Sequence, residues 1–449
     1  MNKEIKYFVF FLIFLLLASC SFDNKTGIWT EDSKKRKRIS KQEQQKSKSE
    51  VINVYSSKDY FLKEIPPTKN VNLTKAKKNS SWKMPGLNLQ NFFGNIYLSG
   101  INNNFLREKI GKNKFSISQN TTSPLIFNDN IFFSDDTGTI FKINQRGKVI
   151  WKKNIYKKIN KSIYKNLSFS IYKNKIFIAD NFGFIYAISI ESGKLIWIKN
   201  HGIPLKSNIK IFNDKIFVIN QDNRIICFDI KQGSKIWDVR SLSSFIKSQS
   251  LLSLAISKEG DLIVLNSSGE LLKIRSHSGM IIWSLNAAGS TFAHATDFFK
   301  SSDVVINVNE VIFSSMSSIF SFNLTNGYLN WVKKIGSENT PIIDGKNIFL
   351  VSDNGFFINI DRNTGKIIWS TNILKILKQK KQKTQITGFI MGSGKIYAVS
   401  LNGYLIVCSA ASGKVEYFKK ISDKITTAPV ISNGSLYILT GNSRILGFR

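Results

Sequence analysis

A short phrase that begins with glycine and ends in an aromatic residue recurs seven times along this chain of 449 residues. Six copies end in tryptophan and the seventh in tyrosine, and neighbouring copies are 38 to 48 residues apart. The aromatic residues are Trp151, Trp197, Trp237, Trp283, Trp331, Trp369 and Tyr417. Each interval contains short alternating strands joined by turn residues and lacks helical periodicity, which is the pattern of a four-stranded antiparallel blade.

The repeated units predict a closed ring. Seven complete units lie at 121–154, 163–200, 205–240, 248–286, 300–334, 339–373 and 386–420. Residues 428–449 supply only three strands of an eighth unit. Because a closed ring leaves no unpaired edge, we expect 104–110 to supply the missing strand, with Leu106 in the tryptophan column. The sequence therefore predicts an all-β fold, an eight-bladed β-propeller of four-stranded antiparallel blades closed by an N-terminal strand.

The repeated phrase resembles the tryptophan-docking motif of quinoprotein-type propellers. The resemblance implies that each of these aromatic side chains lies between two blades and stacks on the peptide near the glycine of the next blade. We therefore assign all seven to packing between blades and none to catalysis. Trp82 precedes the repeats, and we expect it on the outside of the ring or in an upstream extension.

The first twenty residues are typical of a bacterial lipoprotein signal. Lys3 and Lys6 precede an apolar run at 7–17 that is shorter than the roughly 20 residues needed to span a bilayer. The following Ala18-Ser19-Cys20 resembles a lipobox, which implies that Cys20 becomes the lipid-modified N-terminus; an ordinary cleaved signal with a coincidental cysteine is the alternative. We expect a lipoprotein signal peptide at 1–19, a flexible, lipid-anchored basic linker at 20–80 and the propeller at 81–449.

Membrane attachment through two or more acyl chains is effectively permanent. Ser21, rather than Asp, follows Cys20, and by the sorting rule known for enteric lipoproteins this favours the outer membrane over the inner one. The excess of 64 Lys and Arg over 30 Asp and Glu gives a net charge of +34. We attribute most of this charge to a general compositional bias, although the basic linker could lie on anionic headgroups.

Residue patterns for catalysis and metal binding are missing from the sequence. The three cysteines, at 20, 227 and 408, form no CxxC pair, and there are only three histidines. HExxH, GxSxG, the P-loop and the Rossmann glycine pattern are absent. Turn positions hold Asp135, Asp136, Asp180 and Asp353, which we interpret as turn hydrogen bonders rather than as a carboxylate pair. The sequence predicts no enzyme and no cofactor.

Three long connections after tryptophan-bearing strands, at 240–251, 285–302 and 372–387, are expected on one face of the ring. Two of them carry apolar side chains, Phe245 with Ile246, and Phe298 with Phe299, as well as Phe292. Apolar side chains on a polar surface indicate a protein interaction site. The alternative is that these rings fold back over the blade ends. The third connection is rich in lysine and is expected to be solvated.

The combination of lipobox, basic linker and eight tryptophan-anchored blades resembles the BamB family of outer membrane lipoproteins. The resemblance covers about 82–449 and the signal, and its repeat is specific for quinoprotein-like propellers. It implies a monomeric, non-catalytic scaffold on the periplasmic face of the outer membrane. It also implies that the partners are the POTRA region of BamA, other components of the Bam complex and nascent outer membrane proteins, with no nucleic acid.

The resemblance also suggests partner-binding residues. The family's first contact loop pairs apolar residues with an Arg, and Phe245, Ile246 and Lys247 stand in that place here, with Lys instead of Arg. The second loop has two Asp separated by one residue, of which Asp297 matches while Phe299 replaces the other, with Phe298 between them. The alternative functions are a quinone-binding redox propeller and a sugar-binding envelope lipoprotein, and the latter requires an aromatic cluster in the central funnel.

Overall fold

The structure is a computed structural model that describes residues 21–22, 29–30, 61–112, 115, 122–156, 160, 163–241, 252–287, 299–377 and 384–449. The chain divides into two compact units, 1–58 and 59–449. In the first unit, β1 (Ser21–Phe22) pairs antiparallel with β2 (Trp29–Thr30). Across the described ranges, no helix is both long enough and apolar enough to cross a membrane.

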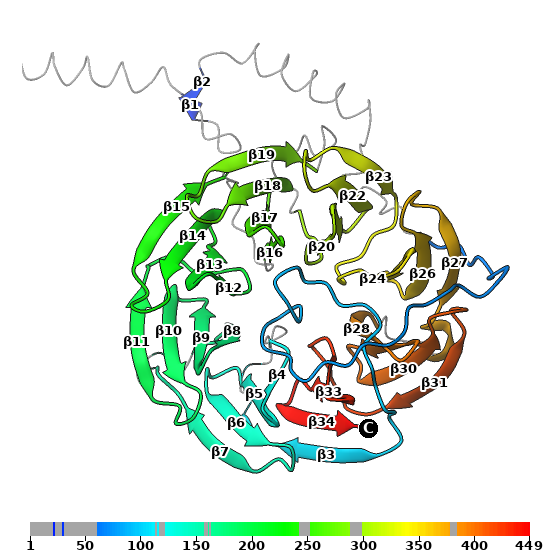
Figure 1. Ribbon diagram of the computed structural model, residues 1–449, viewed down its shortest axis with the longest axis horizontal. Helices are drawn as coiled ribbons and strands as arrows, with labels where there is room; N and C mark the ends of the chain where they lie inside the picture. The colour runs from blue at the N-terminus through cyan, green and yellow to red at the C-terminus, as the bar shows by residue number, and fades with distance from the viewer. Residues whose placement is uncertain are drawn as a thin grey trace, which may run out of the picture. The chain divides into compact units, whose positions relative to one another are not determined.

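The second unit is a ring of eight four-stranded antiparallel sheets (Figure 1). The blades are named here in chain order, with their strands running from the channel outward. Blades 1 to 4 are β4 (Leu125–Phe127), β5 (Asn130–Ser134), β6 (Ile140–Asn144) and β7 (Val149–Lys153); β8 (Leu167–Tyr172), β9 (Lys175–Asp180), β10 (Phe184–Ser189) and β11 (Leu195–Asn200); β12 (Lys210–Phe212), β13 (Lys215–Ile219), β14 (Arg224–Asp229) and β15 (Lys235–Arg240); and β16 (Ser253–Ile256), β17 (Asp261–Leu265), β18 (Glu270–Arg275) and β19 (Ile281–Asn286).

Blades 5 to 7 repeat the same order, and the eighth is completed by an upstream strand. They are β20 (Val305–Asn307), β21 (Glu310–Ser314), β22 (Ile319–Asn323) and β23 (Leu329–Lys333); β24 (Ile342–Asp344), β25 (Asn347–Val351), β26 (Phe356–Asp361) and β27 (Ile367–Asn372), followed by the short helix η2 (Lys375–Leu377); β28 (Ile386–Gly392), β29 (Lys395–Ser400), β30 (Tyr404–Ser409) and β31 (Val415–Lys420); and β32 (Val430–Ser432), β33 (Ser435–Leu439) and β34 (Arg444–Phe448) with β3 (Asn104–Lys109).

Ring closure by an N-terminal strand is confirmed. Strand β3 pairs antiparallel with β34, from Asn104 opposite Phe448 to Lys109 opposite Arg444. Leu106 is 2% exposed. Strand β34 is therefore paired on both sides, with β33 and with β3. The ring has no gap where β3 meets β34 (Figure 1).

A β-bulge recurs beside each tryptophan-column residue. In blade 1 the register of β6 with β7 shifts between Lys142 and Ile143, directly after Lys142 pairs with Trp151. In blade 3 the shift follows the pairing of Cys227 with Trp237. A bulge bends its strand and turns the local side chain, which directs the indole toward the neighbouring blade.

The turn between the second and third strands uses a side-chain oxygen as a hydrogen-bond acceptor. Asp135 Oδ1 accepts the backbone N–H groups of Thr137 and Thr139 at 3.1 and 3.0 Å. Asp180 Oδ1 accepts those of Phe182 and Phe184 at 2.9 and 2.8 Å. Both carboxylates thus serve as turn hydrogen bonders, as expected from the sequence.

The inner three strands of each blade are largely buried, whereas the fourth is mostly exposed or half-buried; in β11 only Trp197 is half-buried and the other residues are exposed. Buried apolar residues form clusters between adjacent blades, such as the group containing Ile211 and Phe228 between blades 2 and 3. Packing between blades, and not only within them, therefore makes up the core.

Residues 61–80, which we expected to belong to a solvated linker, contact the propeller. Ile65 exchanges two backbone hydrogen bonds with Ser370 of β27, at 3.0 and 2.9 Å. The backbone N–H of Val71 donates to the carbonyl oxygen of Ala411 at 3.0 Å. The compact unit accordingly begins at Asp59, because apolar and backbone groups of this segment pair with blades 6 and 7.

Candidate functional site

The tryptophan column joins neighbouring blades by hydrogen bonds as well as by packing. In five blades the indole Nε1–H donates to a backbone carbonyl oxygen of the next blade. These pairs are Trp151 with Ile190 at 3.1 Å, Trp197 with Ile230 at 3.3 Å, Trp237 with Ser276 at 3.1 Å, Trp283 with Leu324 at 3.2 Å and Trp331 with Arg362 at 2.8 Å. The glycine of the next phrase lies under the ring: a Cβ added to Gly233 would lie 2.6 Å from Cζ3 of Trp197.

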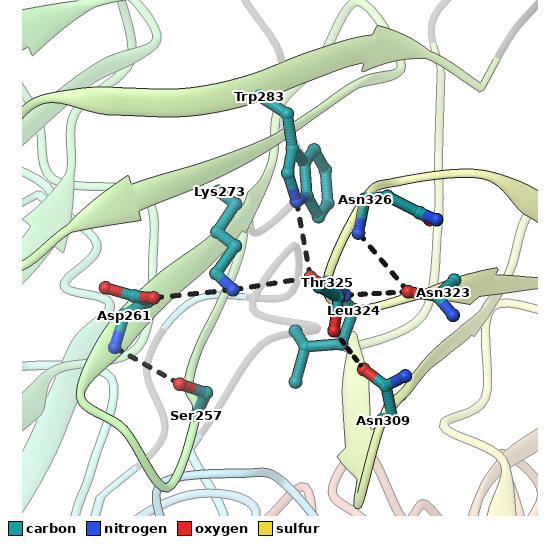
Figure 2. A network of polar contacts seen from close by, with 9 residues as sticks. All are labelled: Ser257, Asp261, Lys273, Trp283, Asn309, Asn323, Leu324, Thr325 and Asn326. Carbon is teal, nitrogen blue, oxygen red and sulfur yellow. Dashed lines mark hydrogen bonds and ion pairs between the residues drawn. The ribbon is translucent and has the colours of Figure 1, made fainter.

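Figure 2 shows one such junction, between blades 4 and 5. The carbonyl oxygen of Leu324 accepts hydrogen bonds from Trp283 Nε1 at 3.2 Å and from Lys273 Nζ at 3.4 Å. Lys273 also forms an ion pair with Asp261 at 3.4 Å. One carbonyl group therefore binds two side chains of the preceding blade, which ties the two blades together at this junction.

Two members of the column differ from this pattern. Trp369 is fully buried, and its Nε1 has no hydrogen-bond partner among the described residues. Its ring packs edge-on against Phe357 of its own blade with centroids 4.8 Å apart, and a Cβ added to Gly413 of blade 7 would lie 2.6 Å from its Cζ3. Trp369 therefore joins blades 6 and 7 by packing alone.

The expected docking of Tyr417 is wrong in this geometry, because its side chain is 41% exposed. The following blade takes its outer strand from β3, so no turn with a glycine connects its third strand to its fourth. The glycine that would cover the ring is missing. At the other side of this blade Leu106 takes the column position, 3.2 Å from a Cβ added to Gly147 of blade 1.

Most of the residues expected to bind a partner lie outside the described ranges. These are Phe245, Ile246, Lys247, Asp297 and Phe298, and the same holds for the expected lipidation residue Cys20. Phe299 is described, and it is only 6% exposed in a cluster with Val304 and Phe313. The expectation of an exposed Phe299 is therefore wrong, because the chain there turns into β20 and places the ring against the core between blades 4 and 5.

The chain between residues 72 and 99, here called the channel segment, was missed by the sequence analysis. It crosses the middle of the ring (Figure 1) and forms hydrogen bonds with all eight blades. Its partners in blades 1, 2, 4, 5, 7 and 8 are backbone groups of or beside the first strands, namely Ile126, Ile171, Ile256, Ile306, Met391 and Gly434. The unpaired inner edges of the blades are thus hydrogen-bonded to the protein's own chain.

Trp82 belongs to this segment and is 4% exposed. Its backbone pairs with Ile126 through hydrogen bonds of 2.8 and 2.9 Å. Of the two expected positions for Trp82, the upstream extension is correct and the outside of the ring is not. The residue lies on the channel side of blade 1. The apolar residues around it, including Leu87 and Phe93, were the available signal, since a linker has no reason to carry them.

Lys210, at the start of β12, anchors the segment to blade 3. Its fully buried Nζ donates to the carbonyl oxygens of Pro85 and Asn88 at 2.9 and 2.7 Å and to Asn91 Oδ1 at 2.6 Å. Burial lowers the pKa of Lys210 to about 7, while the charge of Asp303 acts in the opposite direction. Three acceptors match the three donors of an ammonium group. The side chain therefore satisfies the hydrogen-bond acceptors that residues 85–91 of the segment direct toward it.

A cavity of about 230 Å³ remains in the channel. Trp82, Pro85, Gly86 and Phe93 of the channel segment form one end of it. Its wall consists of residues that directly precede or begin the first strands of six blades, together with Phe389 within the first strand of a seventh: Thr122, Ser123, Asn166, Asn208, Asp303, Thr340, Phe389, Thr426, Thr427, Ala428, Pro429 and Val430. The segment closes the end of the channel where the first strands finish, and the cavity lies toward the end where they begin.

The described residues form no metal site of the kind that a quinone enzyme needs. Within the described part of the chain, no three His, Cys, Asp or Glu residues come together as a metal site. Cys227 and Cys408 are free and buried in blades 3 and 7, and burial raises the pKa of each thiol to about 12. No step of such a reaction can be assigned to these side chains.

Comparison with known proteins agrees with this geometry. The family model described as outer membrane protein assembly factor BamB matches residues 136–371, which is just over half of the chain. The chain belongs to the BamB family. The BamB of Moranella endobia is 22% identical over 291 residues, which cover 59% of this chain and 70% of that protein. An uncharacterized protein of Rickettsia conorii is 20% identical over 369 residues, covering 79% and 88%.

Solved structures show the same fold. BamB from Moraxella catarrhalis superposes with a TM-score of 0.62 at 13% identity, covering 77% of this chain and all of that one. A quinohemoprotein alcohol dehydrogenase from Comamonas testosteroni also has a TM-score of 0.62, at 11% identity, with coverages of 83% and 81%. BamB proteins and quinone enzymes therefore share the ring, and the side chains in it must distinguish them.

Proposed function

We propose that this protein is a non-catalytic scaffold of outer membrane protein assembly that docks on the POTRA region of BamA and supports the insertion of nascent outer membrane proteins. The observation that carries the proposal is membership of the BamB family, whose model covers the four complete blades from β8 to β23 and parts of the two beside them. The rigid junctions between those blades support a holding role, because a scaffold must keep its loops at fixed distances.

The proposed docking face is the one on which the fourth strand of each blade connects to the first strand of the next. The opposite end of the channel is covered by the channel segment, which contacts the turns after the first strands, as at Asp344 and Gly434. The connections from β15 to β16 and from β19 to β20 leave from the open face and contain Phe245, Ile246 and Asp297. With Phe299 in the core, the apolar part of the proposed contact rests on Phe245 and Ile246 of the first connection and on Phe298 of the second.

The absence of catalysis is part of the proposal, as is attachment to the periplasmic face of the outer membrane through a lipid on Cys20. The two buried thiols are protonated at neutral pH because their pKa values are near 12, which removes them as nucleophiles. The basic residues between Cys20 and Asp59 would let the propeller reach away from the lipid anchor.

The experiment is crosslinking of the full-length lipidated protein in its native envelope, followed by identification of the captured proteins. A Phe245→Asp/Ile246→Asp variant tests the face. Val308→Asp is the matched control, because Val308 is an apolar residue, 70% exposed, in the turn between β20 and β21 on the opposite face. We expect BamA with the wild type and the control but not with the test variant. Capture of no barrel-assembly component by any of the three would refute the proposed function.

A further inference from the structure

The cavity in the channel has an unusual lining for so basic a protein. The chain carries 64 Lys and Arg residues, yet neither type lines the cavity. The single charged lining residue is Asp303, whose pKa is raised by burial. The cation whose charge acts on the pKa of Asp303 is Lys210. The amine of Lys210 is already bonded to three oxygens of the channel segment. A phosphate or carboxylate ligand would therefore meet a carboxyl group and no available cation.

Hydrogen-bonding side chains surround the cavity from several blades. Thr122 and Ser123 come from blade 1, Asn166 from blade 2, Asn208 from blade 3 and Thr340 from blade 6. Hydroxyl and amide groups both donate and accept hydrogen bonds. Thr122 and Ser123 donate their hydroxyl hydrogens to the carbonyl oxygens of Leu167 and Ala428, so their oxygens remain as acceptors. Together with the amide groups of Asn166 and Asn208, they can pair with a neutral ligand that presents several hydroxyl groups.

The floor of the cavity is aromatic. The rings of Trp82 and Phe93 lie with centroids 5.7 Å apart and tilted at 55°, and Phe389 adds a third aromatic side chain to the lining. Trp82 Nε1 is buried, and no atom of the described residues accepts its hydrogen bond. Because this nitrogen is not exposed to the cavity, Trp82 offers a ligand its ring atoms and not its N–H group.

The volume limits the ligand to one small ring. Drug-sized ligands occupy pockets of about 300–1,000 Å³, and this cavity is smaller, at about 230 Å³. Aromatic rings at one end, hydroxyl and amide groups around the side and no net positive charge are together suited to a sugar, which has apolar C–H faces and a rim of hydroxyl groups. We propose that the central cavity binds a single neutral sugar unit. This inference does not depend on the proposed role in membrane protein assembly.

The test is saturation-transfer NMR and calorimetric titration of the full-length protein with glucose and N-acetylglucosamine. Glucose 6-phosphate serves as the anionic comparison. We expect saturable binding of at least one neutral sugar, with dissociation constants on the order of 1 mM, and weaker binding of the phosphate. No saturable signal from either neutral sugar would overturn the proposal.

Variants locate the site. Asn208→Ala and Asp303→Asn each remove or alter one lining group, and each is expected to weaken binding about fivefold or more. Asn326→Ala is the matched control, because Asn326 is exposed in the turn between β22 and β23. Unchanged affinity in both test variants would place the binding elsewhere and refute the assignment. If Asp303→Asn impairs folding, Asn208→Ala alone still decides the question.

A trisaccharide of N-acetylglucosamine distinguishes two sources of the sugar. Binding as tight as that of the monosaccharide indicates the end of a glycan chain, whereas loss of binding indicates a free sugar. Both results support the cavity as a sugar site. Binding of the trisaccharide that survives Asn208→Ala unchanged would contradict it.

Discussion

The glycine that opens each repeated phrase allows a decisive test of blade docking, because this chain contains a matched control. Gly233 has a φ of +69°, and a Cβ added to it would lie 2.6 Å from Cζ3 of Trp197. Gly202 has a φ of +77°, and a Cβ there would have no neighbour within 4 Å. Alanine at either position meets a similar backbone penalty, but only at Gly233 does it also meet an indole ring.

The expected magnitudes follow from these contacts. A left-handed backbone conformation costs an L-residue about 1–2 kcal/mol, which is the whole expected effect of Gly202→Ala. Forcing an extra carbon into a packed contact adds about 1–3 kcal/mol. Gly233→Ala should therefore lower the free energy of unfolding by about 2–5 kcal/mol, clearly more than the control.

The assay is urea unfolding followed by far-ultraviolet circular dichroism, with the two alanine variants also made in a Trp197→Leu background. Without the indole ring, Gly233→Ala should cost no more than Gly202→Ala, which gives the coupling directly. Equal costs of the two alanine substitutions in the wild-type background would refute the reasoning. The glycine would then be required only for its backbone conformation, and not for contact with tryptophan.

Three further outcomes are expected. The unfolded chain binds more protons than the folded one between pH 7 and about 10.4, because the pKa of Lys210 falls to about 7 on folding. The free energy of unfolding of the wild type should therefore rise with pH in this window relative to that of Lys210→Met, by up to about 1.4 kcal/mol per pH unit. If urea unfolding gave the two proteins the same dependence on pH, the prediction would be contradicted. Leu106→Ala in β3 should cost about 2–5 kcal/mol in the same assay, whereas Leu62→Ala, at a side chain 68% exposed, should cost almost nothing; equal losses would argue against closure by β3. The thiols of Cys227 and Cys408 should not react with a disulfide reagent at pH 8 until the protein is unfolded in urea, and rapid labelling of the native protein would show that they are accessible.

The sequence was sufficient for the ring but not for what fills it. The tryptophan column and the two-residue periodicity of the strands are local signals, so they predicted the blades and the closing strand around Leu106. The contacts of Lys210 carry no such signal, since its three acceptors come from residues 85–91 and nothing distinguishes it from the many other lysines. Phe299 was misplaced for a related reason: a phenylalanine in a long connection has the same local sequence whether it faces solvent or the core.

Tyr417 shows the limit of reading a repeat as if all its copies were equivalent. Its place in the column is correct, but docking needs a second partner, the glycine turn of the following blade. That turn is missing because the eighth blade is built from the two ends of the described ring, β3 and β34. The repeat shows which position in a blade a residue occupies. Whether its side chain is packed depends on which residues the next blade supplies.

The channel segment has a consequence for the order in which the molecule forms. Its hydrogen bonds reach all eight blades, so the full set can exist only after every blade stands around it. Contacts between such distant parts of a chain form slowly during folding. The backbone N–H groups of Ile171, Ile256 and Ile306, which donate to the segment at 2.8 to 2.9 Å, would therefore gain protection from hydrogen exchange last, and their protection would mark the moment at which the circle is complete.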